Sequence, residues 1–290
     1  MDLELVAKKF EGIGVRLLTE EIADHSPRTP HWLRARGVTL RSWTPPPPAG
    51  PAATFDVRTD RRGEYFLLRY HPRRVEDLRV IDFAPRRRHV VLQLHEKGAR
   101  QKAKFLCGHD ERHWFVAAIP PRPGVTTVET AMDALKPPAV QAAEVKARLK
   151  RGDRLRRRNA AFVRQGEWFF VPRPDLHVDP RMVLRDEPLV RSLRSKAHRA
   201  EECVRLGGDT VYVSRRYPTG LTQAEYEDVL RNNPGARKWG WRVMRRGAEV
   251  YVRGRVRHSD HKMIVLKCWH RVLMNTENEA PNMEHVTFLD

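Results

Sequence analysis

Cysteine is scarce in this sequence. The 290 residues include three cysteines, Cys107, Cys203 and Cys268, which lie far apart along the chain. An odd number without clustered spacing argues against a disulfide framework and against a paired CxxC zinc module. Free cysteines of this kind are typical of a reducing compartment, and we therefore expect a cytoplasmic protein.

Long apolar runs are also missing. None approaches the roughly 18 residues that a membrane-spanning helix needs, and the opening MDLELVAKKFEGIG has no basic region followed by an apolar stretch, which excludes a signal peptide. We expect a soluble protein with no membrane partner. The Walker loop, GxGxxG, HExxH and G-x-S-x-G motifs are absent too, so no common nucleotide-binding or hydrolytic motif identifies an enzyme.

Acidic residues are far fewer than basic ones. The chain has 55 Lys and Arg against 36 Asp and Glu, a formal net charge of +19, while 40% of its residues are hydrophobic. That apolar fraction is enough for real cores, so the charge belongs to folded surfaces. A positive surplus of this size concentrates polyanions near the protein and favours nucleic acid as the partner, ahead of an anionic membrane surface.

The positions of proline and other turn-forming residues predict two β-rich halves. Four consecutive prolines place a loop at 44–53, and aromatic or alternating stretches bounded by turn residues predict antiparallel strands between residues 63 and 120. We expect a β-rich N-terminal domain over 1–136, a helix and basic linker over 137–159, and an α+β domain over 160–290. The fold class is therefore α+β, with mainly antiparallel sheet and a few packed helices.

Two further helices are expected in the second half. The spacing of Leu189, Leu193, Ala197, Ala200 and Val204 predicts a helix within 188–208, which would align Arg191, Arg194 and His198 on one face. Thr222 and Glu225 form a capping box at the start of a helix that Pro234 closes.

The stretch VRHSDHKMIVLKCWHR, residues 256–271, belongs to a predicted hairpin with arms at 248–258 and 263–274. Alternation of side chains gives it an apolar face and a basic face that also carries aromatic rings. Arginine and lysine neutralise phosphates, and aromatic rings stack on bases. The predicted nucleic-acid-binding residues of this ribbon are Tyr251, Arg253, Arg255, Arg257, Lys267, Trp269 and Arg271.

The basic linker is expected to add phosphate contacts that do not depend on base sequence, through Arg154, Arg156, Arg157 and Arg158. Reversal of Arg253, Arg255 and Arg257 to glutamate should weaken binding strongly and leave the fold intact. Because no helix-turn-helix is evident, RNA or a single-stranded or structured target is favoured over duplex DNA.

Two histidine clusters support a different function, a metal-dependent nuclease or phosphodiesterase. One is the turn with His258, Asp260 and His261, and the other is the stretch CGHDERHWF with His109, Asp110 and His113 as catalytic candidates. If 108–112 form a loop, Cys107 faces His113 across a hairpin, and Cys107, His109 and His113 become candidate metal ligands. His258 and His270 would lie about 20–26 Å apart along the predicted hairpin, too far to share one ion.

The sequence thus favours a cytoplasmic nucleic-acid-binding protein that needs no cofactor. The nuclease alternative would require a divalent metal. A third possibility is a structural subunit of a ribonucleoprotein or defence complex, in which the basic surface contacts other protein subunits. Neither composition nor spacing decides whether the protein is an enzyme.

Overall fold

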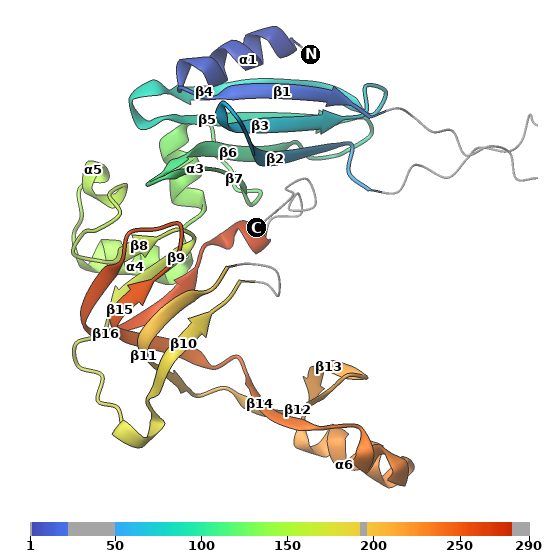
Figure 1. The fold of residues 1–290 in the computed structure, drawn as a ribbon, viewed down its shortest axis with the longest axis vertical. Helices are drawn as coiled ribbons and strands as arrows, with labels where there is room; N and C mark the ends of the chain where they lie inside the picture. Colours follow the sequence, from blue (N-terminus) through green and yellow to red (C-terminus); the bar gives the residue numbers. More distant parts are fainter. Residues whose placement is uncertain (1, 23–49, 192–195, 280–290) are drawn as a thin grey trace, which may run out of the picture. The chain divides into compact units, whose positions relative to one another are not determined.

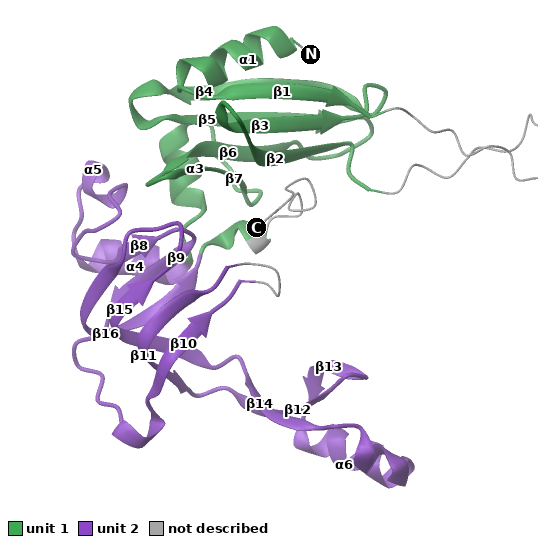
Figure 2. Cartoon of the chain, in the orientation of Figure 1, with its two compact units in different colours: residues 1–137, 275–290 green, residues 138–274 purple. Residues whose placement is uncertain are grey.

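The computed structural model describes residues 2–22, 50–191 and 196–279, so residues 44–49 of the expected proline-rich loop lie outside it. Over these residues the chain has sixteen strands in four mostly antiparallel sheets, together with five α-helices, which confirms the α+β class (Figure 1). The chain forms two compact units, unit 1 with residues 1–137 and 275–290, and unit 2 with residues 138–274 (Figure 2).

Unit 1 begins with an amphipathic helix, α1 (Leu3–Gly12), whose N-terminus is capped by the Asp2 carboxylate, which accepts from Leu5 N at 3.0 Å. Strand β1 (Arg16–Glu21) follows and pairs in parallel with β3 (Gly63–Tyr70), which also pairs antiparallel with β2 (Ala53–Asp60). The helix buries Phe10, whose ring meets Phe66 of β3 edge-on at 5.0 Å. Neither α1 nor β1 is expected from the sequence pattern.

The second sheet of unit 1 is an antiparallel meander of β4 (Val75–Ala84), β5 (His89–Glu96), β6 (Ala103–Asp110) and β7 (His113–Ala118), with the short 3-10 helix η1 (Pro85–Arg87) between β4 and β5. Its central strands are apolar on both faces, because each face is covered. Val90 and Phe105 belong to one core, shared with the first sheet, whereas Val91 and Leu106 pack with helix α3 (Val128–Ala134).

The end of the described chain also belongs to unit 1. Thr276, which starts the 3-10 helix η4 (Thr276–Glu279), donates from its backbone N to Leu135 O at 3.0 Å and from Oγ1 to Ala134 O at 2.9 Å. The observed division therefore differs from the expected 160–290 domain, since residues after Met274 leave unit 2.

Unit 2 is built on a six-stranded sheet with the order β10-β11-β15-β16-β9-β8. The central pair β15 (Glu249–Arg257) and β16 (Ile264–Met274) is the hairpin expected from the sequence, and β9 (Trp168–Pro172) and β8 (Val163–Gln165) extend it on one side. Phe170, Val252, Val256 and Leu266 form the core on one face.

The expected helix and linker over 137–159 are part of this unit. Helix α4 (Pro138–Lys146) buries Val140 against Phe162 and Phe169, and the one-turn helix α5 (Arg151–Arg154) follows. The Asn159 side chain then accepts from the backbone N–H groups of Ala161 and Phe162 at 2.8 and 3.0 Å. The basic segment is thus a folded connection, packed on the sheet.

The predicted helix within 188–208 is wrong. Strand β10 (Leu184–Leu189), preceded by the 3-10 helix η2 (Pro180–Met182), pairs with β11 (His198–Leu206), which in turn pairs with β15. A bulge between Ala200 and Glu202 shifts the register, so the inward residues His198, Ala200 and Cys203 are two and then three positions apart. This spacing imitates the period of a helix.

Residues 209–246, which we call the arm, form a small sheet of their own. Its order is β13-β12-β14, with β12 (Asp209–Ser214), β13 (Tyr217–Leu221) and β14 (Arg242–Arg246). Helix α6 (Gln223–Asn232) starts at the predicted Thr222–Glu225 capping box and leads to the 3-10 helix η3 (Pro234–Lys238). Within unit 2 the arm extends from one end of the six-stranded sheet (Figure 1).

The junction between the arm and the six-stranded sheet is rich in glycine. β12 and β14 continue the paired strands β11 and β15, and the chain crosses the junction at Gly207, Gly208 and Gly247. Gly208 has φ +76°, and a Cβ there would approach Ala248 N and Arg246 O to 2.7 Å, so only glycine fits without displacement. No helix in the described part of the chain is long and apolar enough to cross a membrane.

Candidate nucleic-acid interface

The arginines of the predicted ribbon lie on the expected face of β15, exposed and in ion pairs. Arg253 contacts Glu202 at 2.7 Å, Arg255 contacts Glu201 at 3.1 Å, and Arg257 contacts Asp186 at 3.1 Å. The Arg255 backbone also donates to Glu201, and together these contacts lower the pKa of that carboxyl group. On β16, Arg271 contacts Glu249 at 2.5 Å. Much of the ribbon's charge is therefore balanced by carboxylates of neighbouring strands.

The two aromatic rings of the ribbon are buried. Tyr251 and Trp269 are 4% and 5% exposed, and they pack with Val204 under the segment that carries Leu176, Val178 and Val183. The sequence pattern correctly places them on the basic face, but it does not reveal that residues 173–183 cross that face. As they stand, neither ring offers a free surface to a base.

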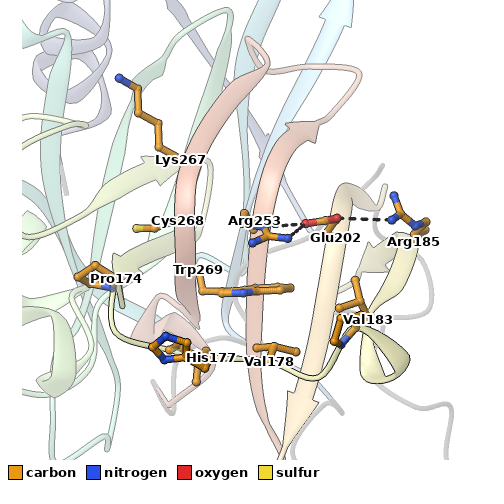
Figure 3. Close-up of a pocket in the computed structure, with 12 residues that line it drawn as sticks. Pro174, His177, Val178, Val183, Arg185, Glu202, Arg253, Lys267, Cys268 and Trp269 are labelled. Carbon is orange, nitrogen blue, oxygen red and sulfur yellow. Dashed lines mark hydrogen bonds and ion pairs between the residues drawn. The ribbon is translucent and has the colours of Figure 1, made fainter.

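A groove of 460 Å³ opens beside the Trp269 ring, between the crossing segment and the sheet. Glu202 lies between Arg253 and Arg185, at 2.7 and 3.7 Å, and the Arg253 guanidinium lies 4.8 Å from the centre of the Trp269 ring (Figure 3). Lys267 lines the same groove and forms no ion pair with a described residue. The groove has charged walls: the single Glu202 carboxylate contacts both arginines, so the lining keeps a positive surplus.

The linker arginines differ among themselves. Arg156 and Arg158 are exposed, and Arg156 lies 3.4 Å from Asp153. Arg154 and Arg157 are half-buried, and Arg154 Nε donates to Leu149 O. Burial, together with the nearby Arg164, lowers the pKa of Arg157 to about 10. Only part of this basic run therefore faces solvent.

The expected metal set in the first histidine cluster does not come together. The turn between β6 and β7 is two residues long, so Asp110 pairs with His113, and Cys107 pairs with Val116 instead of His113. The Cys107 side chain is fully buried in the core, and burial raises the pKa of its thiol. His113 bonds the Glu64 carboxylate at 2.7 Å, and His109 meets Trp114 edge-on at 5.0 Å. These contacts support a structural hairpin tip.

The second histidine cluster gains a member that the sequence pattern does not suggest. His258 and His261 lie in the turn after β15, as expected, and His198 at the start of β11 lies against both of them. Asp260 is paired with Lys196 at 3.0 Å. His270, which bonds the Cys268 carbonyl through Nδ1 at 2.8 Å, is not part of this group.

The arm contains an aromatic platform that the sequence analysis misses. The ring centroids of Tyr217, Trp239 and Trp241 lie 5.7, 6.2 and 6.3 Å apart, with interplanar angles of 14° to 30°. Three such similar distances describe a triangle, because a single column of rings would make one distance about twice the others. The rings are therefore offset from one another, and each is half-buried.

The platform is anchored on one side and cationic on the other. Trp241 Nε1 donates to Ala236 O at 2.7 Å, and the Tyr226 ring meets Trp241 edge-on at 4.9 Å while it stacks on Tyr212 at 4.0 Å. Arg216 lies over the Trp239 ring at 4.2 Å. Trp241 thus supports the platform, whereas Tyr217 and Trp239 form its less constrained part.

Most basic side chains of the arm have no carboxylate partner among the described residues. Residues 209–246 hold eight Lys and Arg against four Asp and Glu, and among the described residues only Arg231 of these eight makes an ion pair, with Asp228. The remaining seven, all exposed, are Arg215, Arg216, Arg237, Lys238, Arg242, Arg245 and Arg246. The combination of basic and aromatic residues is visible in the sequence stretches SRRYP and RKWGWRVMRR, but only the structure brings these two stretches together.

No protein-family model, no curated protein and no solved structure matches this chain.

Proposed function

We propose that this protein binds nucleic acid, with RNA or a single-stranded target favoured, and that the arm is its principal contact surface. The observation that carries the proposal is the half-exposed platform of Tyr217, Trp239 and Trp241 with Arg216 above it, on an arm with eight cations and four acids. Alternating aromatic and cationic groups on one surface are what unpaired bases and their phosphates require.

The chemistry of the two groups is complementary. Aromatic stacking supplies about 1–3 kcal/mol per base with little dependence on sequence, because every base has a π-face. Exposed arginines that lack carboxylate partners release counterions from the phosphates without first breaking an ion pair. In a duplex the faces of the bases are already stacked on neighbouring bases, so the platform favours unpaired bases, whose faces are accessible.

The ribbon on β15 has a secondary place in this proposal. Arg253, Arg255 and Arg257 would have to exchange Glu202, Glu201 and Asp186 for phosphates, which offsets part of the gain. Reversal of these arginines to glutamate would also place like charges against those carboxylates. The triple reversal is therefore expected to disturb the sheet, so it is a poor test of binding.

The proposal is tested by fluorescence anisotropy with labelled single- and double-stranded RNA and DNA of equal length. We expect salt-sensitive binding, tighter for the single strands, and we expect Trp239→Ala to weaken it by about 5- to 150-fold, the equivalent of about 1–3 kcal/mol for one stacked base. The control is Met182→Ala, which removes an exposed apolar side chain that lies outside the arm.

Equal affinity of the Trp239→Ala variant and the parent protein contradicts a role for the platform. Parallel incubations with EDTA, Mg²⁺, Mn²⁺ or Zn²⁺ examine the nuclease alternative, because metal-dependent cleavage would support it over a binding module. The three unpaired cysteines fit the further proposal that the protein acts in the cytoplasm. Co-purification with protein subunits would instead favour a role within a ribonucleoprotein complex.

A further inference from the structure

Three histidines from two segments of unit 2 meet at one end of its core. His198 is the first residue of β11, His258 follows β15, and His261 lies in the turn that leads to β16. Their ring centroids lie 4.1 Å (His198–His258), 4.8 Å (His258–His261) and 5.4 Å (His198–His261) apart. One nitrogen from each ring can be chosen so that all three lie within 4.8 Å of one another.

His198 is the unusual member of the group. It is 1% exposed, and neither Nδ1 nor Nε2 has a hydrogen-bond partner. Loss of hydration without a replacement partner costs about 1–3 kcal/mol for a buried polar group. A buried polar side chain in a native protein is therefore normally satisfied, by protein, by water or by an ion.

The surroundings hold the three rings in place. Trp168 of β9 meets His198 edge-on at 6.3 Å, and Gln165 Nε2 donates to Lys262 O at 2.6 Å, which ties the β8–β9 turn to the histidine turn. Gly166 has φ +57°, and a Cβ there would come within 2.8 Å of His261 Nε2. The absence of a side chain at this position is what lets His261 lie so close to the β8–β9 turn.

We propose that His198, His258 and His261 form a binding site for a divalent transition-metal ion, Zn²⁺ first among them, with one coordination position left for water or another ligand. Imidazole nitrogen is a preferred ligand of Zn²⁺, and three histidines with an open fourth position are a recurrent zinc arrangement. The ion would supply the partner that the buried His198 lacks. This inference is independent of the arm and of nucleic-acid binding.

The site must contract when the metal binds. Zn–N bonds of about 2.0–2.1 Å in a tetrahedron place the nitrogens about 3.4 Å apart, so separations of up to 4.8 Å have to shorten and the stacked rings have to fan apart. His258 Nδ1 now accepts from Asp260 N at 3.2 Å. Coordination through Nε2 requires a proton on Nδ1, so metal binding would break this bond and rearrange the 258–262 turn.

The imidazole of His198 is neutral in the folded protein. Burial, together with the neighbouring His258 and His261, lowers the pKa of His198 to about 3, which leaves its imidazole neutral at ordinary pH. A neutral ring keeps the lone pair that a metal needs. The Asp260 carboxylate in the same turn is paired with Lys196 at 3.0 Å, so most of its negative charge is already offset.

The test uses the full chain, purified without a histidine tag and stripped with EDTA. Titration with ZnCl₂ in a calorimeter should give one ion per chain, and CoCl₂ should give the strong visible absorption of a four-coordinate Co²⁺ site. We expect His258→Gln and His261→Gln each to weaken Zn²⁺ binding by about 100-fold or more, since even loss of an outer-shell partner costs about 10- to 100-fold. Both positions are half-exposed turn residues, so the variants should fold.

His177→Gln is the matched control, because His177 is an exposed histidine of the same unit outside the cluster, and it should bind Zn²⁺ as the parent does. Histidine ring signals in NMR spectra should shift for the three cluster residues on addition of Zn²⁺. Absence of stoichiometric binding in the parent, or binding that survives both cluster substitutions, overturns the proposal. A Co²⁺ spectrum typical of six water or oxygen ligands overturns it as well.

Discussion

Neutralising three exposed cations of the arm should change the salt dependence of nucleic-acid binding by a calculable amount. Arg216, Arg237 and Lys238 are exposed and make no ion pair with a described residue, so replacement of all three by glutamine removes phosphate contacts and breaks no salt bridge. Only the contact of Arg216 with the Trp239 ring is lost with them. The variant is therefore expected to fold like the parent.

The magnitude follows from counterion release. On a single strand, each phosphate contact contributes about 0.7 to the slope of log K against log salt concentration. Three contacts contribute about 2, so the variant should show a slope shallower by about 2 and an affinity about 100-fold lower at a salt concentration of about 0.1 M. The difference should vanish as the salt concentration approaches about 1 M.

The assay is anisotropy with one labelled single strand over a series of salt concentrations. A charge-matched control replaces Arg61, Arg62 and Arg100 of unit 1, which are exposed, by glutamine. The control removes the same net charge and should leave the slope nearly unchanged. Equal slopes for the arm variant and the parent, or an equal loss in the control, would refute the assignment of phosphate contacts to the arm.

Three other predictions concern the folded units. Phe170→Ala, at a fully buried ring in the core of unit 2, should lower the free energy of unfolding by about 3–5 kcal/mol in a denaturant titration. With a thiol reagent, Cys268 should react first and Cys107 and Cys203 only on unfolding, because both are fully buried and burial raises the pKa of Cys203 to about 11. Burial also lowers the pKa of His270 below 6.5, so as the pH falls the unfolded chain takes up a proton at this histidine before the folded chain does. The contribution of His270 to the free energy of unfolding is therefore full above pH 6.5 and declines below it. The His270→Gln variant should show a smaller decline in denaturant titrations between pH of about 7.5 and about 5.

The strands of unit 1 and the β15–β16 hairpin were predictable from the sequence for a local reason. Stretches such as HVVLQLHE and AEVYVRGRVR are short, β-branched or aromatic, and bounded by turn residues, and they became β5 and β15. The Thr222–Glu225 capping box is equally local and was found where it was expected. In each case the residues that determine the element lie within a few positions of one another.

Features that depend on distant residues were not predictable. The bulge at Ala200–Glu202 gave β11 an apolar spacing that imitates a helix, and that assignment hid the position of His198. With His198 in a helix, the histidines of the 258–261 turn had no third partner. The covering of Tyr251 and Trp269 by residues 173–183 also needs tertiary contacts that no local pattern encodes.

Crosslinking locates the contact surface without any substitution. A single-stranded oligonucleotide with photoreactive bases would be bound to the full chain and irradiated, and the crosslinked peptides would be identified by mass spectrometry. Binding by the arm predicts crosslinks at Tyr217 and Trp239, whose rings form the less constrained part of the platform. Crosslinks confined to unit 1 or to the β15–β16 ribbon, with none between residues 209 and 246, would contradict it.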